Sequence, residues 1–136
     1  TIVTNSSLVI PYARANPQLQ LTVVGGAFRA ATESFVGPMA LEQLARFHVS
    51  TAFVGTDGFS PDFGLTTHLV EGAEIVKQMA ERAERTVLVA DSSKFGRRGF
   101  VQVLPLDRVD VVLSDTELSQ DARERISELG VEVETV

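Results

Sequence analysis

Short apolar segments rich in β-branched residues recur along the chain and predict its strands. Nearly continuous hydrophobicity over about four to six residues is typical of a strand that is covered on both faces, as in a parallel sheet. The last segment alternates between apolar and polar positions, which also favours a strand. The expected strands lie at residues 1–4, 19–24, 49–54, 86–90, 109–113 and 131–136.

Apolar residues at helical spacing separate several of these strands. One helix is expected after Pro38, a second along the apolar stripe of residues 75–83, and a third between Ser119 as N-cap and Gly130 beyond its end. Strands that alternate with helices predict the α/β class, as a layered, Rossmann-like and mostly parallel sheet with helices on both faces. A length of 136 residues suits a single domain over residues 1–136.

One long segment, residues 55–69, has no clear period and is rich in Gly, Asp, Ser, Pro and Thr. We expect it to form an irregular loop. Loops of this length inside compact domains are often functional, so this segment is the first candidate for a site.

Composition excludes several classes of function. The net charge is −6, which is the wrong sign for a surface that neutralises nucleic-acid phosphates. The sequence has no cysteine, so it forms no disulfide, thiolate metal site or cysteine nucleophile. No apolar run reaches the roughly 20 residues that cross a bilayer, and no signal-peptide pattern opens the chain. We therefore expect a cytoplasmic protein that does not contact a membrane.

Motifs for common cofactors and metals are also absent. There is no Gly-x-Gly-x-x-Gly after a strand and no Walker-type loop, so neither NAD nor ATP is expected. His48 and His68 lie far apart in the sequence without carboxylates at ligand spacing. We expect no cofactor and no metal.

Polar residues follow the predicted strands at the point where each strand ends. In an open parallel sheet these ends lie along one edge, where ligands bind. Glycine, asparagine and aspartate would also be expected there as ordinary turn residues. The ionisable groups are harder to explain by turn formation alone. The segments concerned are Asn5-Ser6, Gly25-Gly26, Gly55–Gly58, Asp91–Lys94 and Ser114-Asp115.

Lys94 and Arg29 are the candidate contacts to an anion. A lysine in a turn rich in serine and glycine can reach a phosphate as a point charge, and an arginine can bind one with two parallel hydrogen bonds. Gly25 and Gly26 would let the backbone approach the same anion. Each cation is equally consistent with an ordinary exposed side chain.

Asp57 and Glu71 are candidate hydrogen-bond acceptors for sugar hydroxyls. Asp57 is equally well explained as a turn residue between glycines, and Glu71 as a favourable charge in the first turn of a helix. We expect no catalytic set. The candidate ligand-binding set comprises Asn5, Ser6, Gly25, Gly26, Arg29, Asp57, Gly58, Thr67, Glu71 and Lys94.

Several short motifs, taken in order, resemble the C-terminal sensor domain of DeoR-type transcriptional repressors. The resemblance extends from residue 1 almost to the C-terminus, and the last motif is the most specific. The motifs are Thr4-Asn5-Ser6, Gly25-Gly26-x-x-Arg29, Val36-Gly37-Pro38, Gly55-x-Asp57-Gly58, Gly64-Leu65-Thr66-Thr67 with Glu71, and Ala90-Asp91-Ser92-Ser93-Lys94-Phe95-Gly96.

This resemblance implies a fold and a function. The family's sensor domain is similar to ribose-5-phosphate isomerase, glucosamine-6-phosphate deaminase and CoA transferases, and it commonly recognises phosphorylated sugars or similar metabolites. The resemblance thus implies the effector-binding domain of a bacterial repressor that is not an enzyme. It further implies a homo-oligomer that contacts DNA only through another domain.

This sequence also departs from the family pattern. Family members carry an N-terminal winged helix-turn-helix and an opening strand with an Asp-Ser-Gly-Thr-Thr-like phosphate loop, and this sequence starts after both. We expect a sensor domain truncated at its N-terminus. Leu69 and Gly72 stand where family members often have polar residues.

Two alternatives remain open at this point. Asp57, Glu71 and Lys94 along one edge would also suit a sugar-phosphate isomerase-like enzyme, because a carboxylate can transfer protons. The domain could instead serve chiefly in oligomerisation, since repressors commonly bind two-fold operators as dimers and an exposed sheet edge favours pairing.

Overall fold

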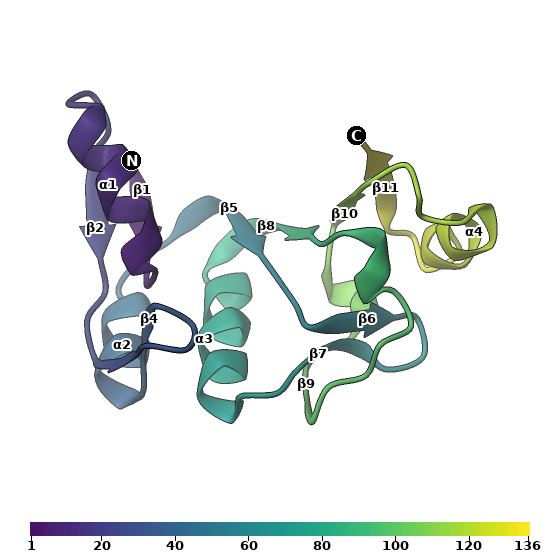
Figure 1. Cartoon of the computed structure of the whole chain (residues 1–136), viewed down its shortest axis with the longest axis horizontal. Helices are drawn as coiled ribbons and strands as arrows, with labels where there is room; N and C mark the ends of the chain where they lie inside the picture. Colours follow the sequence, from purple (N-terminus) through teal and green to yellow (C-terminus); the bar gives the residue numbers. More distant parts are fainter. The chain divides into compact units, whose positions relative to one another are not determined.

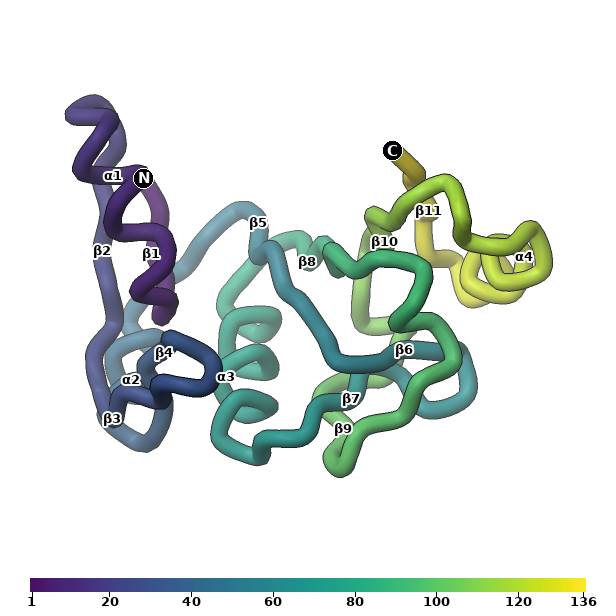
Figure 2. Tube along the Cα trace, in the orientation of Figure 1, coloured from purple at the N-terminus to yellow at the C-terminus, as the bar shows by residue number.

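The computed structural model describes all residues, 1–136, which form two compact units, Thr1–Phe47 and His48–Val136. Figure 1 labels their helices and strands, and Figure 2 traces the chain from the N-terminus to the C-terminus. Each unit is described by itself. The expectation of a single domain over residues 1–136 stays a prediction.

The first unit combines a parallel strand pair with an antiparallel hairpin. Strands β1 and β2 pair in parallel, with Val3 opposite Thr22. Strands β3 and β4 pair antiparallel, with Phe28 opposite Phe35. The elements are β1 (Ile2–Thr4), the 3-10 turn η1 (Ser7–Val9), α1 (Ile10–Ala15), β2 (Leu21–Val23), β3 (Ala27–Arg29), β4 (Ser34–Val36) and α2 (Pro38–Leu44).

The second unit is built on a four-stranded, wholly parallel sheet in the order β11-β10-β8-β5. Helices α3 and α4 flank it, so the predicted α/β class and the layered, Rossmann-like sheet are confirmed. Every segment that the apolar pattern predicted as a strand overlaps one, although β8 begins at Ala83, three residues before the predicted start and within the stripe expected to be helical. The elements are β5 (Val49–Val54), α3 (Val70–Glu81), β8 (Ala83–Val89), β10 (Val111–Ser114), α4 (Gln120–Ser127) and β11 (Glu132–Thr135).

Three further strands form a small antiparallel sheet in the order β6-β7-β9. Two of them lie within residues 55–69, so the expectation of one long irregular loop there was wrong. Both strands of this hairpin are short and begin with a glycine, so the sequence lacks the alternation of apolar and polar residues that indicates a strand. The strands are β6 (Gly58–Ser60), β7 (Gly64–Thr67) and β9 (Val101–Leu104), and the 3-10 turns η2 (Ser92–Lys94) and η3 (Leu106–Arg108) flank β9 in the chain.

One hydrophobic core joins the two sheets and the helices of the second unit. Phe59 and Leu65 enter it from the small sheet, Leu88 and Val112 from the parallel sheet, and Ile126 from α4, all without measurable exposure. Each such side chain contributes about 1.5–3 kcal/mol through burial. The small sheet is therefore part of the same packed body as the parallel sheet.

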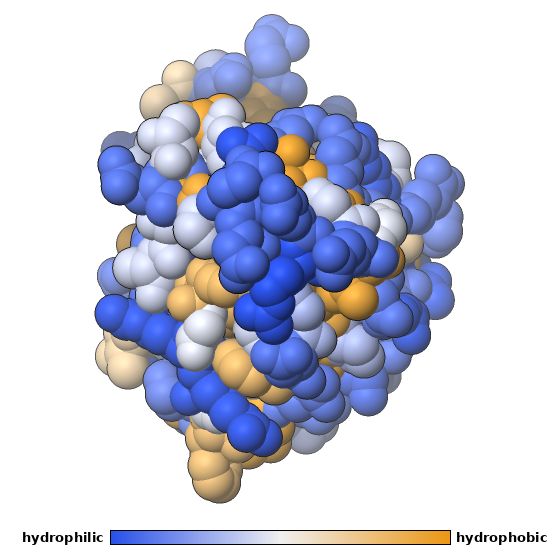
Figure 3. Space-filling model, turned by 90° about the vertical axis from the view of Figure 1, so that its right-hand side faces the viewer, coloured by the Kyte–Doolittle hydropathy of each residue, from blue (hydrophilic) through white to orange (hydrophobic).

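Helix α4 follows its sequence pattern closely. The Ser119 hydroxyl accepts a hydrogen bond from the Ala122 backbone N–H at 3.1 Å and caps the helix. Ala122 and Ile126, four residues apart, are buried, and the charged residues face outward. Figure 3 views this side of the molecule, where hydrophilic side chains cover most of the surface. None of the helices is long and apolar enough to cross a membrane.

Candidate functional site

The carboxyl ends of β5 and β8 define the candidate site in the second unit. These strands are neighbours in the parallel sheet, with Val54 opposite Leu88. The segments that follow them, with Asp57 after β5 and Lys94 at the end of η2, therefore start from the same edge. This is the edge where open parallel sheets bind ligands.

Asp57 is held by the hairpin that follows it. Its Oδ2 accepts hydrogen bonds from the Thr67 hydroxyl at 2.7 Å and from the His68 backbone N–H at 3.0 Å. The backbone N–H of Asp57 donates to the Thr66 carbonyl at 3.1 Å. These bonds fix the carboxylate while leaving Oδ1 with lone pairs for another donor.

The charge state of Asp57 follows from these contacts. Partial burial raises the pKa of this carboxyl, but the hydrogen bonds from Thr67 and the His68 backbone, with favourable charge interactions with His68 and Lys94, outweigh burial. The pKa consequently lies below its ordinary value of 3.8. Asp57 is an ionised acceptor at neutral pH.

Two aspartates hold the turn that presents Lys94. Asp91 Oδ1 accepts hydrogen bonds from the backbone N–H and the hydroxyl of Ser93. Asp115, at the end of β10, accepts from the Ser92 N–H at 2.8 Å and from the Glu117 N–H at 2.9 Å. Hydrogen bonds from Ser93 lower the pKa of Asp91, and those from Ser92 lower the pKa of Asp115. Both stay anionic and keep η2 in place.

The candidate set did not include these two positioning residues, Asp91 and Asp115. The sequence did mark both positions, because Asp91 directly follows one predicted strand and Asp115 lies two residues after another. Their carboxylates bond to η2 backbone rather than pointing away as ligand acceptors. Sequence position alone did not separate these two roles.

Gly58 is required by close packing between two segments. A Cβ atom at this position would lie 2.0 Å from the Arg97 carbonyl oxygen. Beside this contact, the Gly96 N–H donates a hydrogen bond to the Phe59 carbonyl at 2.9 Å. The rings of Phe59 and Phe95 pack edge to face with their centroids 5.5 Å apart. The segment after Lys94 is thereby fixed to the hairpin that carries Asp57.

Glu71 lies in the first turn of α3 and is exposed. A negative charge at this position is favourable to the helix N-terminus, and this role and the ligand contact both remain open for Glu71.

Half of the candidate set lies in the first unit. Asn5 donates from Nδ2 to the Phe35 carbonyl at 2.9 Å. Ser6 caps η1 by accepting from the Leu8 N–H at 3.2 Å. Both side chains therefore support local structure around the β3–β4 hairpin.

The remaining candidates of this unit follow β2. The Gly25 N–H donates to the Gln43 side chain at 2.8 Å, which joins this turn to α2. A Cβ atom on Gly26 would lie 2.6 Å from the Val36 carbonyl oxygen, so only glycine fits there. Arg29 ends β3 opposite Ser34 and is exposed.

The structure therefore brings together part of the candidate set. Asp57 and Thr67 are bonded directly, Gly58 allows the neighbouring contact, and Lys94 is close enough for its charge to act on Asp57. Within residues 1–136, no group of three or more His, Cys, Asp and Glu residues is arranged to hold a metal ion.

In open α/β sheets, ligands commonly bind at the carboxyl edge of the strands, which here carries charged and hydroxyl groups. The sequence profile of the DeoR C terminal sensor domain matches residues 1–116. The chain belongs to this family, and the predicted resemblance is confirmed.

Relatives with known names are transcription regulators. The chain is 39% identical over 132 residues to the HTH-type transcriptional regulator GlpR of Haloferax volcanii, covering 96% of this chain and 51% of that protein. It is 31% identical over 121 residues to the HTH-type transcriptional regulator IolR of Bacillus subtilis, covering 89% and 48%. The chain thus spans about half the length of these relatives.

Proposed function

We propose that this chain senses a phosphorylated sugar or a related phosphorylated metabolite and controls the operator binding of a cytoplasmic transcriptional repressor. In this proposal the effector changes the repressor's affinity for DNA, and DNA is bound by a separate domain. The protein acts by binding and not by turnover, and it works as a homo-oligomer on a two-fold operator.

The observation that carries this proposal is the placement of Lys94 and Asp57 after two neighbouring parallel strands, where the charge of Lys94 helps to lower the pKa of Asp57. Lys94 supplies a positive charge for a phosphate, and Asp57 supplies an ionised acceptor for sugar hydroxyls. The two groups lie at the carboxyl edge of neighbouring parallel strands. Glu71 is proposed as a further ligand contact in the second unit, with Gly58 and Thr67 as supports within the hairpin. In the first unit, taken by itself, Asn5, Ser6, Gly25, Gly26 and Arg29 are proposed as ligand contacts.

The net charge supports the assignment of DNA binding to another domain. At −6, this chain repels nucleic-acid phosphates on balance, whereas sensing a single phosphate needs only one or two local cations. Family membership and the regulator names of the relatives support a binding role over an isomerase-like activity.

A thermal-unfolding screen tests the proposal. The chain is heated with sugar phosphates and with the matching unphosphorylated sugars, and Lys94→Ala is compared with Lys77→Ala, which removes an exposed lysine on α3. A ligand at about 100 times its Kd stabilises the fold by about 2.7 kcal/mol, which is several degrees in Tm.

The proposal predicts a phosphate-dependent rise in Tm that is clearly smaller in Lys94→Ala than in the parent and that Lys77→Ala keeps in full. Equal rises with phosphorylated and unphosphorylated sugars, or a rise in Lys94→Ala as large as in the parent, would contradict it. Phosphorus NMR of the stabilising ligand then separates a sensor from an enzyme. A sensor produces no new product resonance over hours of incubation, whereas an enzyme does.

A further inference from the structure

A hollow lies on the small antiparallel sheet, at the β6–β7 turn and the segment that leads into β9. Its volume is about 220 Å³, which suits a metabolite of a few heavy atoms rather than a drug-sized molecule. None of its lining residues belongs to the candidate set around Asp57 and Lys94. The lining residues are Asp62, Phe63, Thr66, Arg98, Gly99, Phe100 and Gln102.

The backbone around the hollow is held in place. The Gly99 N–H donates to the hydroxyl of Thr66 at 2.7 Å, and the residue Thr66 is only 2% exposed. A Cβ atom on Gly99 would lie 2.8 Å from the Thr67 backbone, so the segment fits only with glycine there. Gln102 donates from Nε2 to the Phe63 carbonyl at 3.0 Å and joins the opposite wall.

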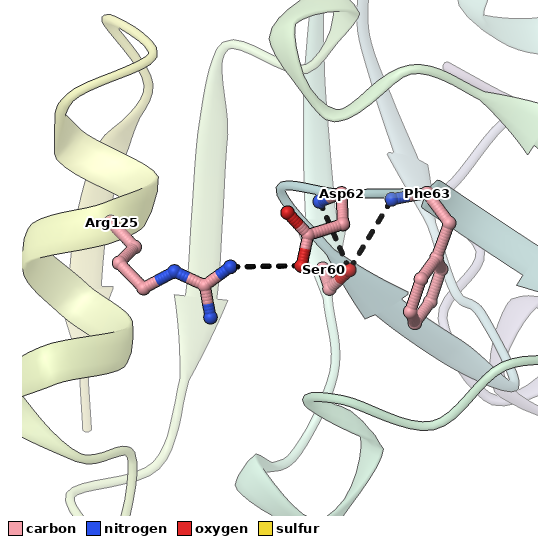
Figure 4. A network of polar contacts seen from close by, with 4 residues as sticks. All are labelled: Ser60, Asp62, Phe63 and Arg125. Atoms are coloured by element: carbon pink, nitrogen blue, oxygen red, sulfur yellow. Dashed lines mark hydrogen bonds and ion pairs between the residues drawn. The ribbon is translucent and has the colours of Figure 1, made fainter.

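The turn of the hairpin is also fixed, as Figure 4 shows. The Ser60 hydroxyl accepts hydrogen bonds from the backbone N–H groups of Asp62 at 3.1 Å and Phe63 at 3.3 Å. The Asp62 carboxylate points toward Arg125 of α4 and pairs with it at 3.0 Å. The one carboxylate in the lining is therefore paired with a cation outside the lining.

Arg98 leaves the hollow with a positive charge. Its guanidinium lies over the Phe63 ring, 5.6 Å from the centroid, and it takes part in none of the ion pairs of the second unit. An arginine that rests on an aromatic face keeps N–H donors for a carboxylate or a phosphate. With Asp62 paired to Arg125, Arg98 is the one charged group of the lining that has no ion-pair partner, and its positive charge favours an anion in a chain whose overall charge is −6.

The hollow also offers a contact for a carbon skeleton and a further polar group. Phe100 lines it and is 81% exposed, which is unusual for a large aromatic residue that has no partner to cover it. Gln102 keeps its side-chain oxygen as an acceptor after donating to Phe63. Together with Arg98 these groups match a small molecule with one anionic end and a hydroxylated or apolar body.

We infer that this hollow is a second ligand site, which binds a small organic anion through Arg98 with Gln102 and Phe100 against its body. The anionic group is a phosphate or a carboxylate, since a guanidinium binds both in the same two-pronged way. This site shares no lining residue with the candidate set of the proposed sensing site, although both are built on strand β7.

Nitrogen-15 NMR of the chain tests this inference with two probes, inorganic phosphate and succinate, each titrated at constant ionic strength. The experiment uses the Lys94→Ala background, so binding at the Asp57–Lys94 site does not contribute. We expect saturable shifts in the Gly99 and Phe100 amides and in the Arg98 side-chain N–H for at least one probe. A phosphate-only response names phosphate ligands, and a succinate-only response names carboxylates.

Arg98→Gln should weaken this binding about tenfold or more, because a charged pair of hydrogen bonds is lost. Arg97→Gln is the matched control, since it removes the same charge from a neighbouring exposed residue outside the lining. Arg98→Lys keeps the charge but loses the two-pronged geometry, so it should bind the probe more weakly than the parent. This variant replaces Arg98→Gln as the test if Arg98→Gln shifts amide resonances outside the hollow, which would indicate a wider structural change.

Three outcomes overturn the inference: shifts that stay linear with both probes, equal weakening in the Arg97→Gln and Arg98→Gln variants, or full affinity in Arg98→Lys. Failure here leaves the proposed sensing function standing, because its screen depends on Lys94.

Discussion

Thr67 in β7 donates its hydroxyl hydrogen to the Asp57 carboxylate over 2.7 Å, which closes the β6–β7 hairpin onto the end of β5. Asp57 follows a strand of the parallel sheet, and Thr67 ends a strand of the antiparallel one. The candidate site therefore joins two sheets through one charged hydrogen bond, and the strength of that bond is open to measurement.

Acid should weaken the fold through Asp57. Its pKa in the folded state lies below the ordinary value of 3.8, so the unfolded chain binds the proton more readily. The stabilisation is complete above about pH 3.8 and is lost as the pH falls through the folded pKa. Urea unfolding from about pH 6 down to about pH 3 should show a smaller acid loss in Asp57→Ala than in the parent.

A double-mutant cycle assigns this effect to the hydrogen bond. Thr67→Val should reduce the acid loss in the parent, and it should change little in the Asp57→Ala background. If Thr67→Val has the same effect in both backgrounds, the bond does not set the pKa of Asp57.

Gly58→Ala should destabilise the protein by about 1–3 kcal/mol or more, because the added methyl group meets the Arg97 carbonyl oxygen at 2.0 Å. Gly55→Ala is the matched control, since a Cβ atom there has no neighbour within 4 Å. That variant should stay within about 1 kcal/mol of the parent. Similar unfolding midpoints for the two variants would refute the close contact.

Leu88→Ala should cost about 2–5 kcal/mol of unfolding free energy, because Leu88 is 0% exposed in the shared core. Val89→Ala, at the next position and 46% exposed, should cost well under half as much. Denaturant unfolding of both variants measures the difference. Equal costs would place β8 in a different register from the one described.

Asp115→Ala should loosen the turn that carries Lys94. The Ser92 N–H loses its carboxylate acceptor at 2.8 Å, so its hydrogen exchange should speed up about tenfold or more. Asp121→Ala, in the first turn of α4, provides a control that leaves Ser92 bonded. An unchanged Ser92 exchange rate in Asp115→Ala would show that η2 is held by other contacts.

The apolar runs predicted the parallel sheet well, because a strand covered on both faces needs hydrophobic residues at nearly every position. Val109–Leu113 and Val49–Val54 are of this kind, and each coincides with a strand to within two residues. Helix α4 was equally clear, since Ser119 and Ile126 mark its cap and its buried face.

The antiparallel parts could not be predicted in the same way. Strands β6 and β7 are three and four residues long, and their glycines are set by contacts to Arg97 and Leu104, which are distant in the sequence. The hollow at Arg98 was missed for the same reason. Its walls come from the turn at Asp62 and from residues 98–102, and only the folded hairpin places them together.

The site was predicted in part. Asp57 and Lys94 stood out because ionisable groups followed strands, and the structure puts them at neighbouring strand ends. Asn5 and Ser6 followed a strand as well, yet their side chains bond to nearby backbone. Turn chemistry and ligand chemistry use the same residue types, so only the contacts distinguish them.

Operator release by the intact regulator tests the central claim most directly. The sugar phosphate that raises Tm in the screen is added to the regulator bound to its operator, and the affinity for DNA is measured for the parent and for Lys94→Ala. The account predicts that the effector weakens DNA binding by the parent and leaves the variant, which binds DNA equally well without effector, unchanged. An effector that alters neither protein's affinity, or both to the same extent, would contradict it.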